Sequence, residues 1–249
     1  MVTGAGKAFA RHVFAVQHYV ESTSARYAGL HQPGLVTHPI VCFGDLSRAR
    51  IITVGLNPSF GEFARKRAWP ESIDHENLAR RCCGYFSASN PPHPWFAPWI
   101  AGLKHVGVDY ASGTAAHVDL SPRATRFVSE FNAPDRALFL EMVERDLWTF
   151  FGTLESCRAA EWLLIAGTVT SEFYINEFIQ RYAPDHGYEL EGSFICAQHP
   201  GRAKTAFHKL RGGGRSFEVF FCSSSPSDRL PTLLPQRIRE NAHRWKRRK

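Results

Sequence analysis

The chain has 249 residues, of which 44% are hydrophobic, so it can bury a full core, and we expect a single domain over residues 1–249. Its formal net charge of +7 and isoelectric point near 9.3 favour an anionic partner, nucleic acid above all, although the same charge also serves solubility. No apolar run is long enough to span a bilayer, and the first residues lack the apolar core of a secretory signal. These features predict a soluble, cytoplasmic protein with no membrane partner.

The first elements predicted along the chain are a helix, a loop and a buried strand. Residues 7–20, "KAFARHVFAVQHYV", place apolar side chains at helical spacing. Proline and glycine between Pro33 and Pro39 mark a loop. The β-branched residues 51–54 predict a buried strand, and the Gly-Leu-Asn-Pro sequence that follows ends it in a sharp turn.

The middle of the chain predicts two helices and a second strand. A polar helix is expected from Glu71 to Cys82. The proline-rich segment after it leads into a helix that begins at Trp95 or Trp99 and runs towards residue 106. The sequence "TAAHVDLSP" predicts a short strand that ends at Pro122.

The strongest helix pattern covers residues 133–151, where apolar side chains recur on one face and Asp135 is the expected cap. Next, "EWLLIAG" predicts a buried strand that ends in glycine, followed by a helix through residues 173–179. Both "GSFICAQHPG" and "FEVFFCSS" predict further strands. The chain closes with a basic tail at residues 236–249.

The order of these elements predicts the fold class. Apolar strands that alternate with helices imply a parallel sheet covered on both faces. We therefore expect an α/β fold, a three-layer αβα sandwich with a central, mainly parallel sheet of four strands. In such sheets, ligands bind outside the carboxyl ends of the strands. The expected site is the rim that four strand ends would share, at Asn57, Asp119, Gly167 and His199.

The cysteines and histidines do not show the spacing of a metal site. No two of the six cysteines have the C-x-x-C spacing of zinc or iron–sulfur ligands, so we expect reduced, mostly buried thiols. None of the 12 histidines has the i, i+4 spacing with a third ligand that would support zinc binding. We therefore expect no metal and no other cofactor.

Two short motifs that follow strands carry a resemblance to a known family. Gly55-Leu56-Asn57-Pro58 matches the pattern G-x-[DN]-P, and His199-Pro200-Gly201 matches H-P-[SG]. The segments "GYFSASNPPHPWFAPWI" and "HVDLSP" lie between them in the family's order, and "FFCSSSPSDRL" follows. Over residues 41–232 the chain thus resembles the uracil-DNA glycosylase superfamily. Each motif alone is short, and the order and strand context give the match its specificity.

The resemblance implies a monofunctional, metal-independent DNA glycosylase of base excision repair. Such a hydrolase cleaves the N-glycosidic bond of a damaged or deaminated base that has been flipped out of the stack. By this resemblance Asn57 would hold the attacking water and His199 would stabilise the departing base. Gly55, Leu56 and Pro58 would shape the base pocket. Each role has a simpler alternative, because Asn-Pro favours turns and a histidine can serve as a cap or core residue.

Phe86 and Asp119 are the candidates for contact with the base. Phe86 stands where the family has its stacking ring, with Tyr85 and Trp69 as substitutes, although most of the 19 phenylalanines should be core. Asp119 replaces the family's base-reading Asn, and an ionised carboxylate, which only accepts hydrogen bonds, would repel O4 of uracil. Either the preferred base presents donors, or Asp119 is protonated in a closed pocket, or it caps the next turn and touches no base.

The loop after the His-Pro pair is the expected DNA contact. By the resemblance, Gly201, Arg202 and Lys204 enter the minor groove, with Arg202 as the wedge and Lys204 on a phosphate. A solvated basic loop is the alternative. The basic tail should add salt-sensitive affinity for double- or single-stranded DNA. Nothing in the sequence demands a dimer, and we expect a monomer.

Two other functions would use the same rim. One is a non-catalytic module that binds a lesion or flipped nucleotide. It is favoured because Asn57 is a weaker base than Asp, and because Asp119 stands where the family has Asn. The other is a hydrolase of nucleosides or another small substrate, which would make no use of the basic excess. The sequence assigns no role in the site to His117 or His93. It places four aromatic residues in the core: Trp95, Phe96, Trp99 and Tyr110.

Overall fold

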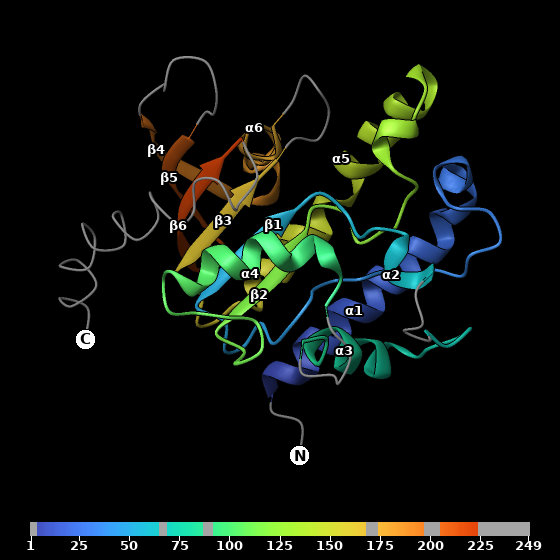
Figure 1. Ribbon diagram of the computed structural model, residues 1–249, viewed down its shortest axis with the longest axis horizontal. Coiled ribbons are helices and arrows are strands. Elements are labelled where there is room, and N and C mark those ends of the chain that lie inside the picture. The colour runs from blue at the N-terminus through green and yellow to red at the C-terminus, as the bar shows by residue number, and fades with distance from the viewer. Residues whose placement is uncertain (1–3, 65–68, 87–91, 168–173, 197–204, 224–249) are drawn as a thin grey trace.

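The centre of the molecule is a six-stranded sheet in the order β2-β1-β3-β6-β5-β4 (Figure 1). The computed structural model describes residues 4–64, 69–86, 92–167, 174–196 and 205–223. The strands are β1 (Ile51–Gly55), β2 (Ala115–Asp119), β3 (Trp162–Ala166), β4 (Tyr188–Cys196), β5 (Thr205–Gly212) and β6 (Arg215–Cys222). Neighbours among β2, β1, β3 and β6 pair in parallel, and β5 pairs antiparallel with both β6 and β4. The protein therefore has an α/β fold with a mixed sheet.

The expected sheet of four strands is wrong, because the sheet has six: "FEVFFCSS" joins it as β6, and β5 was not predicted at all. The charged residues Lys209 and Arg211 interrupt the apolar pattern of this segment, so its sequence does not resemble a buried strand. In the sheet these charges are paired across neighbouring strands, Lys209 Nζ with Glu218 Oε1 at 3.1 Å and Arg211 Nη1 with Glu191 Oε1 at 2.5 Å. With β5 inserted, β6 and not β4 is the neighbour of β3.

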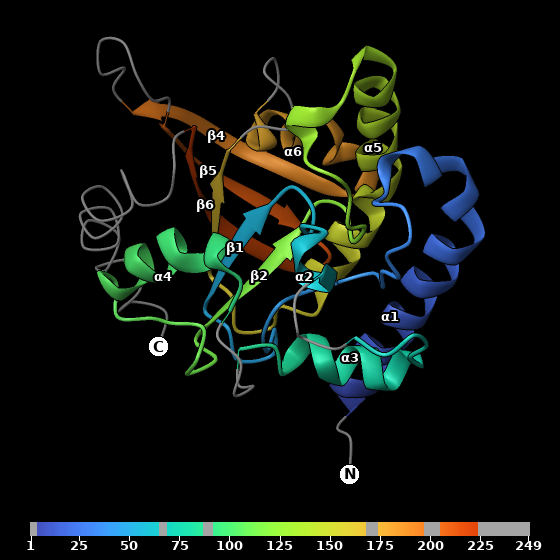
Figure 2. The same ribbon diagram turned by 45° about the vertical axis from the view of Figure 1, so that its right-hand side comes forward.

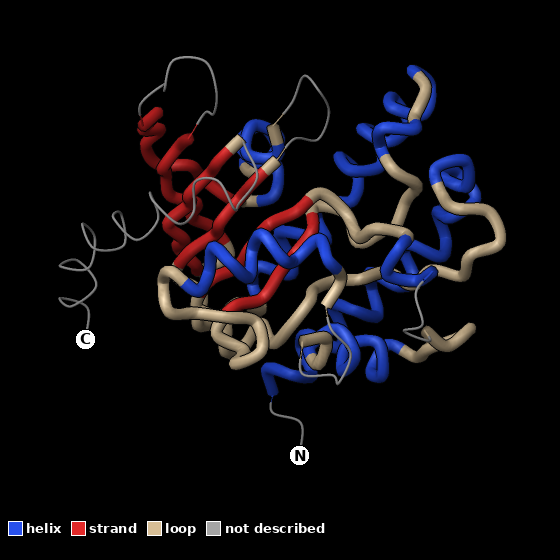
Figure 3. Tube along the Cα trace, viewed as in Figure 1, coloured by secondary structure: helices blue, strands red, loops and turns tan. Residues whose placement is uncertain are grey.

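Helices lie on both sides of the parallel part of the sheet. In both ribbon views α4 (Ala97–Lys104) and α5 (Ala133–Glu155) lie on opposite sides of β1 and β2 (Figures 1 and 2). Two further contacts involve helices. α1 (Gly4–Thr23) packs on α3 (His75–Cys83), and α6 (Ile175–Tyr182) packs on β3. The short α2 (Gly61–Ala64) follows β1. Figure 3 shows the strands running from the upper left to the centre of the molecule, with the helices gathered around the central strands.

Local sequence explains where these helices begin. The expected N-terminal helix and the expected strand at residue 51 are confirmed as α1 and β1. The cap of α5, however, is Asn132 and not Asp135, because the Asn132 side chain accepts a hydrogen bond from the Asp135 backbone nitrogen at 2.8 Å. Asp135 instead lies in the first turn, where its charge favours the positive end of the helix.

The two strands β1 and β2 are buried along their whole length, as is typical of central parallel strands. Three of their residues, Thr53, His117 and Asp119, are nevertheless polar. Buried polar groups need hydrogen-bond partners, so each of these three side chains must bond to a neighbour or to a ligand. Within the described ranges, no helix combines the length and the apolar character needed to cross a membrane.

The carboxyl ends of the strands lie at one edge of the sheet. Gly55 is paired with Asp119, and Ala166 with Cys222 of β6, so β2, β1, β3 and β6 end side by side. The end of β4, at Cys196, lies at the same edge but three strand spacings from Ala166, or about 14 Å. The strand ends therefore do share one edge of the sheet, as expected. β4 ends there too, but as the outermost strand on the side opposite β2.

Candidate functional site

A cavity of about 360 Å³ opens at the carboxyl ends of β1, β2 and β3. Its volume lies within the range of small-ligand pockets, and its position is where parallel sheets bind ligands. Eight polar residues line its wall: Asn57, Ser59, Glu62, His93, His117, Asp119, Thr125 and Arg126. The apolar part is formed mainly by aromatic rings, from Phe43, Trp95, Phe96 and Phe127.

Gly55 lets the carboxylate of Asp119 lie directly over the end of β1. A Cβ atom at Gly55 would lie 2.3 Å from Asp119 Oδ1 and 2.8 Å from His117 Nε2, which is closer than carbon can approach either atom. The glycine is thus required by a close approach of side chains from the neighbouring strand. This gives the Gly of the G-x-N-P sequence a physical role at the floor of the cavity.

Asn57 lies at the cavity wall with its side chain held in one orientation. Its Nδ2 donates to the backbone oxygens of Pro58 and Arg123, both at 3.1 Å, and lies 3.0 Å from Thr125 Oγ1. Since these contacts fix the amide nitrogen, the carbonyl oxygen Oδ1 points away from them. Among the described residues it has no hydrogen-bond partner, so it is free to accept a hydrogen bond from a molecule in the cavity.

A buried ion pair supports the loop that holds Asn57. Arg123 Nε lies 3.1 Å from Asp146 Oδ2 of α5, and both side chains are fully buried. Ser121 Oγ donates to the same carboxylate at 2.6 Å, while Arg123 Nη1 donates to the Val20 backbone oxygen at 3.2 Å. The loop after β2 is thereby tied to α1 and α5, which fixes the backbone oxygen that orients Asn57.

A line of hydrogen bonds runs from Asp119 into the core. His117 Nε2 lies 3.0 Å from Asp119 Oδ1, and His117 Nδ1 lies 2.8 Å from Thr53 Oγ1. Thr53 Oγ1 in turn lies 2.6 Å from the Tyr110 hydroxyl. Burial raises the pKa of Tyr110 well above its usual range, so its hydroxyl stays protonated as a donor. The polar residues of β1 and β2 are thus partners of one another.

Aromatic rings enclose the polar floor. The rings of Trp95 and Phe96 lie 4.9 and 5.3 Å from the His117 ring, both edge to face. At the mouth Phe127 is 52% exposed and Trp95 is 45% exposed, and Phe127 packs on Phe60 with the ring centroids 4.9 Å apart. Large aromatic rings exposed beside a cavity offer flat surfaces on which a planar ligand can stack.

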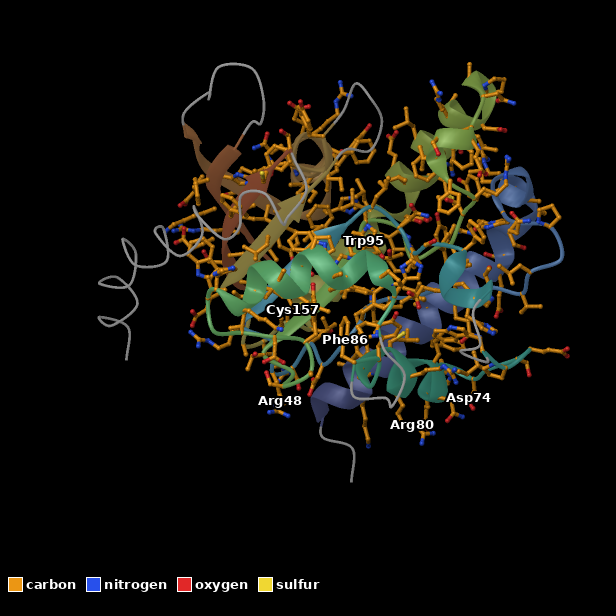
Figure 4. All side chains as sticks on the ribbon, viewed as in Figure 1. Arg48, Asp74, Arg80, Phe86, Trp95 and Cys157 are labelled. Carbon is orange, nitrogen blue, oxygen red and sulfur yellow. The ribbon has the colours of Figure 1, made fainter. Side chains whose placement is uncertain are left out.

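The structure gathers five of the residues assigned to the site in the cavity wall: Gly55, Leu56, Asn57, Pro58 and Asp119. Phe86 is not in that wall. Its ring stacks on Tyr110 at 4.2 Å and packs edge to face on Phe96 at 5.0 Å. Figure 4 shows Phe86 towards α3 and Trp95 nearer the strand ends. Its expected stacking role stays a prediction, and the exposed rings at the cavity are those of Trp95 and Phe127.

The remaining residues assigned to the site fall outside the described residues: His199, Gly201, Arg202 and Lys204. Their segment joins β4 to β5, and both strands are described at its ends. β4 ends and β5 begins at the strand-end edge, on the side of the sheet away from β1. Contact between His199 and the cavity stays a prediction.

The sequence reading missed His117, His93 and Trp95. A usable signal existed for His117, because residues two apart on a strand share a face and His117 precedes Asp119 by two. No local signal marked Trp95, which the sequence had placed in the core. That prediction is confirmed for Phe96, Trp99 and Tyr110, which are buried.

The chemistry that this wall can perform is polar and acceptor-rich. Asn57 Oδ1 and the Asp119 carboxylate both accept hydrogen bonds at the floor, while Ser59 and Arg126 add donors elsewhere in the wall. Within the described ranges no three His, Cys, Asp or Glu side chains are grouped so as to hold a metal ion. The arrangement suits a planar ligand with hydrogen-bond donors and a water molecule held beside it.

Comparison of the chain with protein-family models, with curated proteins and with solved structures finds no match in any of the three.

Proposed function

We propose that the protein is a DNA glycosylase that hydrolyses the N-glycosidic bond of a damaged or deaminated base flipped out of the DNA. The observation that carries this proposal is the fixed Asn57 side chain, whose carbonyl oxygen is available at the wall of a cavity that can hold one base. The resemblance of the G-x-N-P and H-P-G motifs to the uracil-DNA glycosylase superfamily agrees with it.

In this mechanism Asn57 Oδ1 accepts a hydrogen bond from a water molecule. As the glycosidic bond breaks, positive charge develops on the sugar and negative charge on the leaving base. The water oxygen then attacks the anomeric carbon and loses one proton to solvent, and the anionic base takes up one proton from solvent as it leaves, which completes the hydrolysis. An amide is not a strong general base, so Asn57 acts by orientation and turnover should be slow.

Two features of the molecule support a nucleotide as the ligand. Trp95 and Phe127 expose ring faces at the cavity mouth, and stacking of a base on an aromatic ring contributes about 1–3 kcal/mol. The net charge of +7 favours binding to a phosphate backbone. A nucleoside hydrolase would use the same cavity but would gain nothing from that charge.

A non-catalytic module that recognises a flipped base is the second candidate. The observation that favours it is the amide at residue 57, because a carboxylate at that place would be a far better base for activating water. Base-release and binding measurements separate the two candidates.

The test is base release from a panel of oligonucleotides that contain uracil, hypoxanthine, xanthine or ethenocytosine, single-stranded and paired, with a chelator present. We expect slow release of one base by the wild-type protein. Asn57→Ala and His199→Ala should each abolish release and leave DNA binding nearly intact. Asn77→Ala, an exposed Asn on α3, is the matched control and should release the base at the wild-type rate.

Other outcomes would contradict all or part of the proposal. Tight binding of one lesion without release would favour the recognition module. Equal loss of binding and release in Asn57→Ala would indicate a folding defect, which thermal unfolding of the variant would reveal. Failure of the wild-type protein to bind any oligonucleotide would overturn both candidates, and binding that is insensitive to salt would argue against a DNA substrate.

A further inference from the structure

The hydrogen bonds behind Asp119 run in one direction. An imidazole holds a proton more tightly than a carboxylate does, so in the 3.0 Å contact Nε2 of His117 is the donor and Oδ1 of Asp119 the acceptor. The other ring nitrogen, Nδ1, is then an acceptor, and Thr53 donates to it at 2.8 Å, which is shorter than the 3.3 Å from the same hydroxyl to the Ala116 backbone oxygen. Thr53 Oγ1 accepts in turn from Tyr110. Each group thus donates towards Asp119, whose Oδ1 is the last acceptor in the line.

The surroundings of His117 hold this arrangement in place. His117 is 1% exposed, and its ring is enclosed by Phe43, Trp95 and Phe96. The strand pairing of β1 with β2 sets Thr53 directly beside His117. The imidazole therefore has a fixed rotamer and fixed partners on both nitrogens, and it presents the Asp119 carboxylate in one orientation.

One oxygen of Asp119 remains for a ligand. Oδ1 is occupied by His117 and lies over Gly55. Oδ2 has no hydrogen-bond partner among the described residues, although Asp119 is 93% buried, being 7% exposed, and lines the cavity. Oδ2 is open to the cavity and not fully enclosed by protein, so a donor on a ligand can reach it. The cavity thus contains a fixed acceptor, with a second one at Asn57 Oδ1.

We infer that Asp119, oriented by His117, makes this cavity select nucleobases that present an amino group at the inserted edge and reject those that present a carbonyl there. The inference rests on the proposed function, since it takes the ligand to be a base. An amino group donates to Oδ2, whereas a carbonyl oxygen at the same place faces the like charge of a carboxylate oxygen. Asp119 is the residue that touches the base, and His117 is a positioning residue.

The experiment measures binding separately from cleavage. Oligonucleotides carry a 2′-fluoro-arabino nucleotide, in which the fluorine resists cleavage of the glycosidic bond, so dissociation constants are obtained on intact ligands. Two matched pairs differ only in the exchanged group, cytosine with uracil and adenine with hypoxanthine. We expect the wild-type protein to bind the amino member at least about tenfold more tightly in the pair that fits the cavity.

Three variants test the assignment. Asp119→Asn, whose amide both donates and accepts, should bring the two members to within about threefold of each other. His117→Phe fills the same aromatic space without the Nε2–H donor and should also lower the ratio, whereas a purely structural role would weaken both members equally. Asp185→Asn, an exposed carboxylate near the start of β4, is the matched control and should keep the wild-type ratio. Thermal unfolding of each variant reports separately on the fold.

The outcomes distinguish this inference from the proposed function. Equal binding of both members by the wild-type protein overturns the inference and leaves the glycosylase standing, provided that Asn57-dependent base release is seen. An unchanged ratio in Asp119→Asn also overturns the inference. An amino preference without any base release upholds it for a recognition module and overturns catalysis. Failure to bind every oligonucleotide overturns both.

Discussion

Lowering the pH from about 7.5 to about 5 should destabilise the protein through His208, an imidazole buried in β5. His208 is 4% exposed, and neither ring nitrogen has a hydrogen-bond partner among the described residues. Burial lowers the pKa of His208 to about 4, because the charged ring would have to leave water without compensation. The native protein therefore keeps this ring neutral at a pH where the unfolded chain protonates it.

The size of the effect follows from the two pKa values. In the unfolded chain a histidine has a pKa near 6.5, so the folded value of about 4 is depressed. For a depressed histidine, stability is unaffected above about pH 7 and falls as the pH drops through the unfolded value. At pH 5 the unfolded chain carries almost a full proton at this residue and the native protein about a tenth, which corresponds to a loss of about 2 kcal/mol.

Urea unfolding at the two pH values measures this loss, and His208→Leu isolates it. Leucine fits an apolar site and cannot titrate, so the variant should lose about 2 kcal/mol less than the wild type between the two pH values. Burial also lowers the pKa values of His12 and His31, so the total loss in the wild type should exceed the part due to His208. His18→Gln changes an exposed histidine and serves as the control. An equal loss in the wild type and His208→Leu would refute the reasoning.

Three further perturbations probe the site and its support. Gly55→Ala should displace the Asp119 carboxylate and destabilise the fold by about 1–3 kcal/mol, measured by urea unfolding, because its Cβ would lie 2.3 Å from Oδ1; a variant as stable as the wild type with unchanged DNA binding would contradict this. Asp146→Asn should lower the free energy of unfolding by about 3–5 kcal/mol, because it leaves the fully buried Arg123 guanidinium without its counter-charge. A decrease below about 1 kcal/mol would show that the fold does not depend on this ion pair. Trp95→Ala should weaken oligonucleotide binding by about 1–3 kcal/mol, and it should also lower the melting temperature, because the ring, although 45% exposed, packs on His117 and Phe96. Undiminished affinity would exclude stacking on this ring.

The local elements were largely readable because their signals lie within a few residues. The β-branched run that forms β1, the Gly-Leu-Asn-Pro turn after it and the apolar face of α5 each specify their structure through backbone preference and periodicity. The same signals placed Asn57 and Asp119 at strand ends. Helix capping was less certain, because Asn132 and Asp135 lie close together and both are suitable caps.

Strand order was not readable, because it depends on pairing between distant segments. Charged residues on β5 gave no strand signal until their partners on β4 and β6 were known. The result matters for the site, since the insertion of β5 moves the end of β4 about 14 Å from the end of β3. The sequence had expected His199 to share a rim with Asn57 without this separation.

What the sequence by itself determined is the α/β class and the polar residues that end the buried strands, since both depend on the order and periodicity of neighbouring residues. Only the tertiary structure decided what those residues contact. Asn57 is oriented by Arg123 and Thr125, and Asp119 by His117, because parallel strands and the loop after β2 bring distant backbone together. Side-chain chemistry is set by such neighbours, so the acceptor character of the cavity emerges only when the chain is folded.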